Sequence, residues 1–244
     1  MLARVADVSV LADLARAPER TGLFFDLDGT LSPIVARPED SYVPDETRAE
    51  IERLVARYRL VACVTGRDGD SARRILGADG GTYVGEHGLE LEPAAEKWRA
   101  PLARFLTSVS WQEADVENKG LTASLHYRNA PDEDAARVDL DAIAERARNE
   151  GFRARFGRKV LELLPPVEAS KRSAVLHLLE REGLERALYA GDDTTDLDAF
   201  AALEGLELAV RVAVSSVEGP EALRAQADVV VASPAELAAL LRLL

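Results

Sequence analysis

The segment from Gly22 to Gly29 constrains the fold and chemistry of this chain more than any other stretch. Four uncharged residues run directly into two aspartates, Asp26 and Asp28. The uncharged residues suit a buried strand. Side chains two apart on extended backbone point the same way, so the two carboxylates would converge where the strand ends. Gly29 would then allow a sharp turn.

Two converging carboxylates repel each other and disturb each other's protonation. A divalent cation would relieve this repulsion, and Mg²⁺ prefers one or two carboxylates together with the phosphate oxygens of a substrate. The segment therefore predicts a metal-assisted phosphoryl site, in which one aspartate is free to act as a nucleophile.

The order of the remaining predicted elements indicates two domains. Strands and helices alternate along the first 97 residues, which is typical of a parallel α/β sheet. From residue 98 the pattern becomes helix, two strands, helix, two strands, as in a small α+β unit with an antiparallel sheet. After residue 166 the first pattern resumes. We therefore expect a Rossmann-like α/β core made of residues 1–97 and 167–244, with residues 98–166 inserted as a second domain.

The bulk properties of the chain argue against several classes of protein. The formal net charge of the 244 residues is −13, whereas nucleic-acid binding relies on a basic surface. The one cysteine, Cys63, lies in an apolar run and fits a reducing cytoplasm. The sequence has no run of 18 apolar residues, so we expect no membrane span. We expect a cytoplasmic monomer that binds neither nucleic acid nor membrane, and whose partner is a small molecule.

Chemically active residues follow the expected parallel strands of the core, at the sheet edge where ligands bind in open α/β folds. Together they provide acids for a metal and a nucleophile, a hydroxyl and a cation, which are the groups that phosphoryl transfer needs. In chain order the residues after strands are Asp26, Asp28, Thr65, Arg67, Glu86, His87, Asp192, Asp193 and Asp196. The cation, Lys171, is added by a helix expected to start at Ser170.

At these residues the chain resembles a known superfamily. Asp26-Leu-Asp28-Gly-Thr, Thr65, Lys171 and Gly191-Asp-Asp-Thr-Thr-Asp196 are similar to the four motifs of haloacid dehalogenase (HAD)-like phosphohydrolases. The insertion between the second and third motifs resembles a type-2 cap domain. Finer features resemble the trehalose-6-phosphate phosphatases: Thr65-Gly-Arg67, Gly85-Glu-His87-Gly88, Glu117-Asn-Lys119-Gly, His126-Tyr-Arg128 and the segment 159–165. Arg172 and Leu197 depart from the usual glycine and acidic residue of the motifs.

The resemblance implies a role for each matching residue. Asp26 would attack phosphorus, and Asp28 would act as general acid and then as general base. Thr65 and Lys171 would bind the transferring phosphoryl group. Mg²⁺ would be held by Asp26, the Asp28 carbonyl and Asp192, with Asp193 or Asp196 in support. Contacts to the substrate would come from Arg67, Glu86, His87, Glu117, Lys119, Arg128, Lys159 and Glu162.

Several readings stay open at this level. The first is a Mg²⁺-dependent phosphatase that cleaves trehalose 6-phosphate. The alternatives are a phosphatase for another sugar or glycosyl-glycerate phosphate, a mutase, and a catalytically idle module that binds sugar phosphates. Each motif also has a plain structural reading. Asp192 and Asp193 could cap a helix, Arg67 could only pair with a carboxylate, and the polar residues of the insertion could be a solvated hairpin surface.

Overall fold

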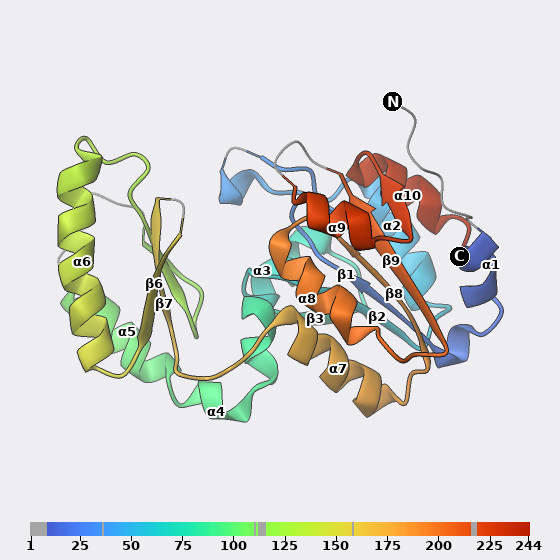
Figure 1. The fold of residues 1–244 in the computed structure, drawn as a ribbon, viewed down its shortest axis with the longest axis horizontal. Coiled ribbons are helices and arrows are strands. Elements are labelled where there is room, and N and C mark those ends of the chain that lie inside the picture. Colours follow the sequence, from blue (N-terminus) through green and yellow to red (C-terminus); the bar gives the residue numbers. More distant parts are fainter. Residues whose placement is uncertain (1–8, 36, 110, 112–115, 158, 216–218) are drawn as a thin grey trace. The chain divides into compact units, whose positions relative to one another are not determined.

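The computed structural model describes residues 9–35, 37–109, 111, 116–157, 159–215 and 219–244. The chain forms two compact units, which Figure 1 shows as ribbons. One unit comprises Met1–Gly88 with Ala169–Leu244, and the other comprises Leu89–Glu168. No helix of the described part of the chain is long and apolar enough to cross a membrane.

The first unit is built on a six-stranded sheet with the order β10-β9-β8-β1-β2-β3, in which every neighbouring pair is parallel. The predicted parallel α/β sheet is thereby confirmed. All five residues of β1 are buried, and the strand lies between β8 and β2. The strands are β1 (Thr21–Phe25), β2 (Leu60–Val64), β3 (Thr82–Val84), β8 (Arg186–Gly191), β9 (Leu208–Val214) and β10 (Val229–Val231).

Helices cover the two faces of this sheet (Figure 1). They are α1 (Ser9–Leu14), α2 (Asp45–Val55), α3 (Gly69–Leu76), α7 (Lys171–Glu182), α8 (Thr194–Ala202), α9 (Glu221–Gln226) and α10 (Pro234–Leu241). The helical spacing of apolar residues near the start of the chain predicts a helix over residues 2–17. The structure has this helix from Ser9 to Leu14. Residues 15 and 16 form a turn instead, and residues 1–8 lie outside the described part.

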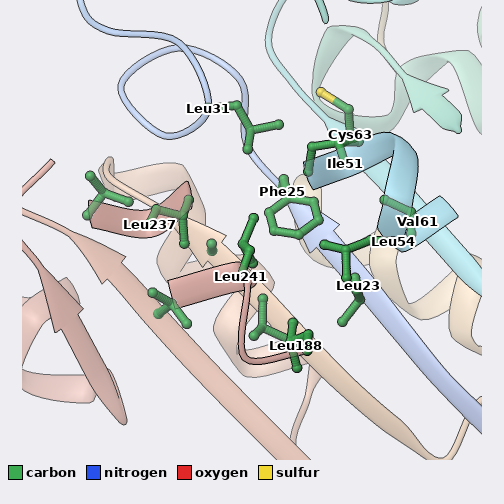
Figure 2. Packing of buried hydrophobic residues seen from close by; sticks show 14 of the residues in the cluster. Leu23, Phe25, Leu31, Ile51, Leu54, Val61, Cys63, Leu188, Leu237 and Leu241 are labelled. Atoms are coloured by element: carbon green, nitrogen blue, oxygen red, sulfur yellow. The ribbon is translucent and has the colours of Figure 1, made fainter. Parts of the chain in front are cut away.

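The alternation of side chains along β1 divides the core into two layers. Leu23 and Phe25 point to the face where α2 and α10 contribute Ile51 and Leu241, and Figure 2 shows this cluster from close by. On the opposite face the Tyr189 ring of β8 packs edge-on against Phe200 of α8, with ring centroids 6.0 Å apart. Because helices cover both faces of the sheet, its strands consist mostly of consecutive apolar residues.

Cys63 belongs to the first of these layers, where its side chain is 3% exposed. Burial, with a contribution from the Asp26 carboxylate, raises the pKa of its thiol well above the ordinary value. The thiolate is the reactive form. We therefore expect no reaction with an aromatic disulfide reagent in the native protein and one thiol per chain in denaturant. Fast labelling of the native protein would contradict this packing.

The second unit is an α+β layer with a four-stranded antiparallel sheet of order β4-β5-β7-β6. One face of the sheet packs on two helices through an apolar cluster that includes Leu102, Phe105, Leu125, Leu140 and Leu161. The elements are α4 (Pro93–Glu96), α5 (Arg99–Ser108), β4 (Val116–Asn118), β5 (Ala123–His126), α6 (Glu133–Asn149), β6 (Arg153–Gly157) and β7 (Val160–Leu164). The sequence predicts the first strand of this unit over residues 114–118, and residues 114 and 115 lie outside the described part.

Candidate active site

Asp26 follows the last residue of β1 at the carboxyl edge of the core sheet. Its backbone N–H donates to the Ala190 carbonyl at 2.9 Å, which extends the sheet ladder by one bond. Its carboxylate is buried, and Oδ1 lies 2.8 Å from the Lys171 ammonium nitrogen. Burial raises the pKa of Asp26 to about 8, because the neighbouring Lys171 only partly offsets the desolvation and the charge of Asp196 adds to it.

Asp196 is fully buried, and four donors saturate its carboxylate. Oδ1 accepts from the Lys171 ammonium and from the Tyr189 hydroxyl, both at 2.7 Å. Oδ2 accepts from the backbone N–H groups of Asp192 and Asp193, both at 2.9 Å. Asp196 therefore fixes the lysine and the turn that follows β8. Burial lowers the pKa of Lys171, but the two carboxylates outweigh it and raise that pKa above its ordinary value.

Three buried carboxylates could hold a metal ion. Oxygens of Asp26, Asp192 and Asp196 all lie within 4.8 Å of one another, and they form the metal-capable group found among the described residues. Burial, followed by repulsion from Asp196, raises the pKa of Asp192 to about 7. Thr30 Oγ1 donates to Asp192 Oδ1 at 3.2 Å. The raised pKa values mark a cluster of acids that a divalent cation would stabilise in the ionised form.

Asp193 stands apart from this group. Its side chain caps α8, accepting from the Thr194 N–H at 2.6 Å, and it is exposed. Of the two acids considered as metal support, only Asp196 belongs to the buried cluster.

Gly29 makes the close approach of Asp192 possible. Its φ of +80° is one that residues with a Cβ rarely adopt, and a Cβ there would overlap the Asp192 carboxylate. We expect Gly29→Ala to destabilise the fold by about 1–2 kcal/mol through the left-handed backbone conformation. It should also displace Asp192 and weaken binding of divalent metal. Urea unfolding and metal titration measure the two effects, and Gly205→Ala (φ +86°, no neighbour within 4 Å of its Cβ) is the matched control.

Asp28, the second aspartate of the opening segment, is 40% exposed and pairs with Arg67. Arg67 Nε donates to Oδ2 at 2.6 Å and Nη2 donates to Oδ1 at 2.9 Å. Ser41 Oγ donates to the same Oδ1 at 2.9 Å. Arg67 therefore forms a bidentate pair with Asp28. Its contact with the substrate stays a prediction.

The loops after β2 and β3 are tied together at Thr65. The Thr65 hydroxyl accepts from the Arg67 N–H at 3.3 Å, and its carbonyl accepts from the His87 N–H at 2.9 Å. The Glu86 N–H donates to the Arg67 carbonyl at 2.7 Å. Glu86 and His87 both have positive φ, at 50° and 55°. Backbone strain of this kind gathers at functional sites. A Cβ on Gly66 would lie 2.6 Å from His87 Nε2, so glycine is needed for this packing.

The predicted sugar-contacting residues lie in the second unit, where the strand register places two of them on one sheet face. Glu117 pairs with Ser124, Ser124 with Glu162, and Glu162 with Arg155, so these four side chains lie on the same face of the sheet. Arg155 Nε lies 2.5 Å from Glu162 Oε2, and Lys119 Nζ lies 3.6 Å from Glu117 Oε2.

The remaining two candidates of this unit are placed differently. Lys159 Nζ donates to Glu133 Oε1 at 2.6 Å, near the start of α6. Arg128 is exposed beyond the end of β5. Their roles in substrate binding stay predictions.

Sequence reasoning missed three side chains that complete the network: Thr30, Ser41 and Tyr189. Tyr189 had a detectable signal, since a phenol within an apolar strand three residues before an acidic turn has to find a partner when buried. Ser41 carried none, because nothing along the chain marks which hydroxyl of the irregular segment after Leu31 returns to Asp28.

The chain is similar in sequence to known proteins. The sequence model of the family described as trehalose-phosphatase matches residues 24–234. A probable trehalose-phosphate phosphatase D of Arabidopsis thaliana is 32% identical over 224 residues, covering 80% of this chain and 60% of that protein. The first curated relatives are longer proteins, of which this chain spans between 55% and 64%.

Solved structures share the fold. The crystal structure of a trehalose-6-phosphate phosphatase related protein is similar with a TM-score of 0.73 and 24% identity, covering 91% of this chain and 95% of that chain. A haloacid dehalogenase-like hydrolase from Bacteroides thetaiotaomicron has a TM-score of 0.59 and 16% identity, covering 92% and 99%. The expected core with an inserted cap is the fold of these proteins.

Proposed function

Since this chain belongs to the trehalose-phosphatase family, we propose that it hydrolyses trehalose 6-phosphate to trehalose and phosphate. The observation that carries the proposal is the buried cluster in which Lys171 lies against Asp26 and Asp196, beside Asp192. A carboxylate nucleophile, a fixed cation and two further acids in one buried place are what transfer of a phosphoryl group to an aspartate requires.

The acids fit a divalent cation, for which we propose Mg²⁺. The fit rests on the three carboxylates within 4.8 Å and on the raised pKa values of Asp26 and Asp192. Asp26, Asp192 and the Asp28 carbonyl would hold the ion. Asp196 already accepts four hydrogen bonds, and it would support the site by fixing Lys171 and the turn that carries Asp192. When bound, the ion supplies positive charge that neutralises the phosphoryl oxygens and the nucleophile.

The chain's own residues then divide the reaction into two steps. An Asp26 oxygen attacks phosphorus, the bond from phosphorus to the sugar oxygen breaks, and the leaving oxygen takes the proton of the Asp28 carboxyl. A water then attacks phosphorus and gives one proton to the Asp28 carboxylate. The bond from phosphorus to the Asp26 oxygen breaks, so that phosphate leaves and the Asp26 carboxylate is restored. Lys171 holds the phosphoryl oxygens with a fixed positive charge, and Thr65 adds a hydroxyl donor.

Substrate selection would belong to the second unit. Glu117 and Glu162 share one sheet face with Lys119 beside them. Carboxylates accept from sugar hydroxyls and an ammonium donates to them. Cytoplasmic location and a monomeric state stay predictions.

A phosphate-release assay over a substrate panel tests the function. We expect Mg²⁺-dependent release from trehalose 6-phosphate, with a kcat/KM at least about tenfold above those for glucose 6-phosphate and a glucosyl-glycerate phosphate, a difference of 1.4 kcal/mol in transition-state binding. A chelator should stop the reaction and added Mg²⁺ should restore it.

The alternatives give different results in the same assay. A higher kcat/KM for a glycosyl-glycerate phosphate would reassign the substrate and keep the reaction. Binding of trehalose 6-phosphate without phosphate release would indicate the idle module, and phosphate that moves between sugar positions would indicate a mutase.

A further inference from the structure

The side chain of Asp28 is held by Arg67, from the loop after β2, and by Ser41, a later residue of the connection between β1 and α2 in which Asp28 itself lies. The guanidinium of Arg67 forms two hydrogen bonds, one to each carboxylate oxygen, at 2.6 and 2.9 Å. Ser41 donates to Oδ1 at 2.9 Å. Two parallel bonds from a planar fork fix the plane of a carboxylate, which one point charge does not do.

The two residues that hold Asp28 are themselves anchored. Arg67 Nη1 donates to the Pro38 carbonyl at 3.1 Å, and the Arg67 side chain is only 17% exposed. Ser41 Oγ lies 3.0 Å from Ser32 Oγ. Ser32 in turn accepts from the Gly29 N–H at 2.8 Å through its carbonyl. The network therefore joins the loop after β1, the loop after β2 and the segment 38–41 around one carboxylate.

We propose that Arg67 and Ser41 are positioning residues, which hold the Asp28 carboxyl in the orientation that serves proton transfer. This inference rests on the proposed function, because it assigns them to the acid and base step of that reaction. Asp28 is 40% exposed, so without these bonds its side chain would rotate about χ1 and χ2, whereas the bonds hold it in one orientation. The inference distinguishes action through Asp28 from direct contact of Arg67 with substrate.

The leaving group provides the first test. A sugar oxygen is a poor leaving group that needs a proton, and p-nitrophenolate leaves without one. Because kcat/KM reports only the steps up to transfer of phosphoryl to the enzyme, it isolates the acid step from the later hydrolysis of the aspartyl-phosphate. For Arg67→Gln we expect kcat/KM to fall about 10²-fold on trehalose 6-phosphate. On p-nitrophenyl phosphate we expect less than about a threefold fall. Ser41→Ala should show the same selectivity with a smaller fall.

A double-mutant cycle with Asp28→Asn provides the second test. If Arg67 acts only through Asp28, then Arg67→Gln should cost no further activity on trehalose 6-phosphate in the Asp28→Asn background, within about threefold. Independent contact with the sugar would make the two losses multiply. Arg74→Gln is the control, because this substitution removes the same charge. Arg74 lies on the following helix, where it donates to Ser71 Oγ.

Each outcome has one reading. Equal falls on both substrates would overturn the inference, and so would multiplying losses in the cycle. A selective fall together with a silent second mutation would support it. Wild-type protein that releases phosphate from neither substrate would instead overturn the proposed function, so the two failures are distinguishable.

Discussion

Asp26→Asn is expected to lower phosphate release from any sugar phosphate by about 10³-fold or more. The amide has nearly the shape of the carboxylate, but its oxygen is a poor nucleophile and cannot form the aspartyl-phosphate. Phosphate-release kinetics with excess Mg²⁺ measure the loss. Asp198→Asn, at an exposed position of α8, is the matched control and should retain wild-type activity. Activity that survives in the Asp26 variant would move the nucleophile elsewhere.

The same variant should be as stable as the wild type or more stable when metal is absent. The folded pKa of Asp26, about 8, lies above the value of 3.8 expected in the unfolded chain. A carboxyl with a raised folded pKa contributes stability below pH 4, and that contribution is lost as pH rises toward 8. Metal-free wild type should therefore lose stability between pH 4 and pH 8, and the asparagine variant should lose less. Thermal unfolding in chelator at pH 6 and pH 8 measures the difference.

Lys171→Met should have the largest effect on stability, with a loss of about 3–5 kcal/mol in metal-free protein. Lys171 is 2% exposed and lies within 2.8 Å of both the Asp26 and the Asp196 carboxylates. Its removal leaves the two buried acids without the cation that both contact, with Asp196 charged and unpaired. It also removes the charge that would stabilise the transferring phosphoryl group. Unfolding in urea measures the free energy, and the phosphate assay measures the activity.

Two further variants make this expectation specific. Arg172→Met changes the exposed neighbour on the same helix and should cost less than about 0.5 kcal/mol. Adding Asp196→Asn to Lys171→Met removes the unpaired buried charge and should recover part of the stability without restoring activity. A Lys171 variant no less stable than the Arg172 control would show that the lysine does not hold the buried acids together.

The gathering of acidic side chains at one edge of the core sheet could be predicted because these residues follow recognisable strands. The apolar run before Asp26 and the alternation of strands and helices indicated a parallel sheet, and such sheets gather their loops at one edge. The second unit was predicted from the change of pattern near residue 98, and its antiparallel sheet was predicted from the two pairs of consecutive strands in that pattern. These are local signals that a chain shows in its own sequence.

Partners that meet across the fold could not be predicted in this way. The sequence left open whether Asp193 or Asp196 supports the metal, since both fit the motif. The packing separates them, because the helix start exposes Asp193 and turns Asp196 inward onto Lys171 and Tyr189. The sequence also left open whether Arg67 contacts the substrate or only pairs with a carboxylate. In the fold its guanidinium binds Asp28, and contact with the substrate stays a prediction.

The sequence by itself determined which residue types stand at the sheet edge and in what order: Asp26, Asp28, Thr65, Lys171 and Asp192. Strand periodicity and the short turns that follow fix these positions along the chain. Only the tertiary structure decided which group neutralises which. Pairing of a buried charge depends on distances across packed elements, and desolvation raises the pKa of Asp26 to about 8 only where those elements exclude water. The opening segment thus supplies both aspartates, while the fold buries one beside Lys171 and leaves the other half-exposed against Arg67.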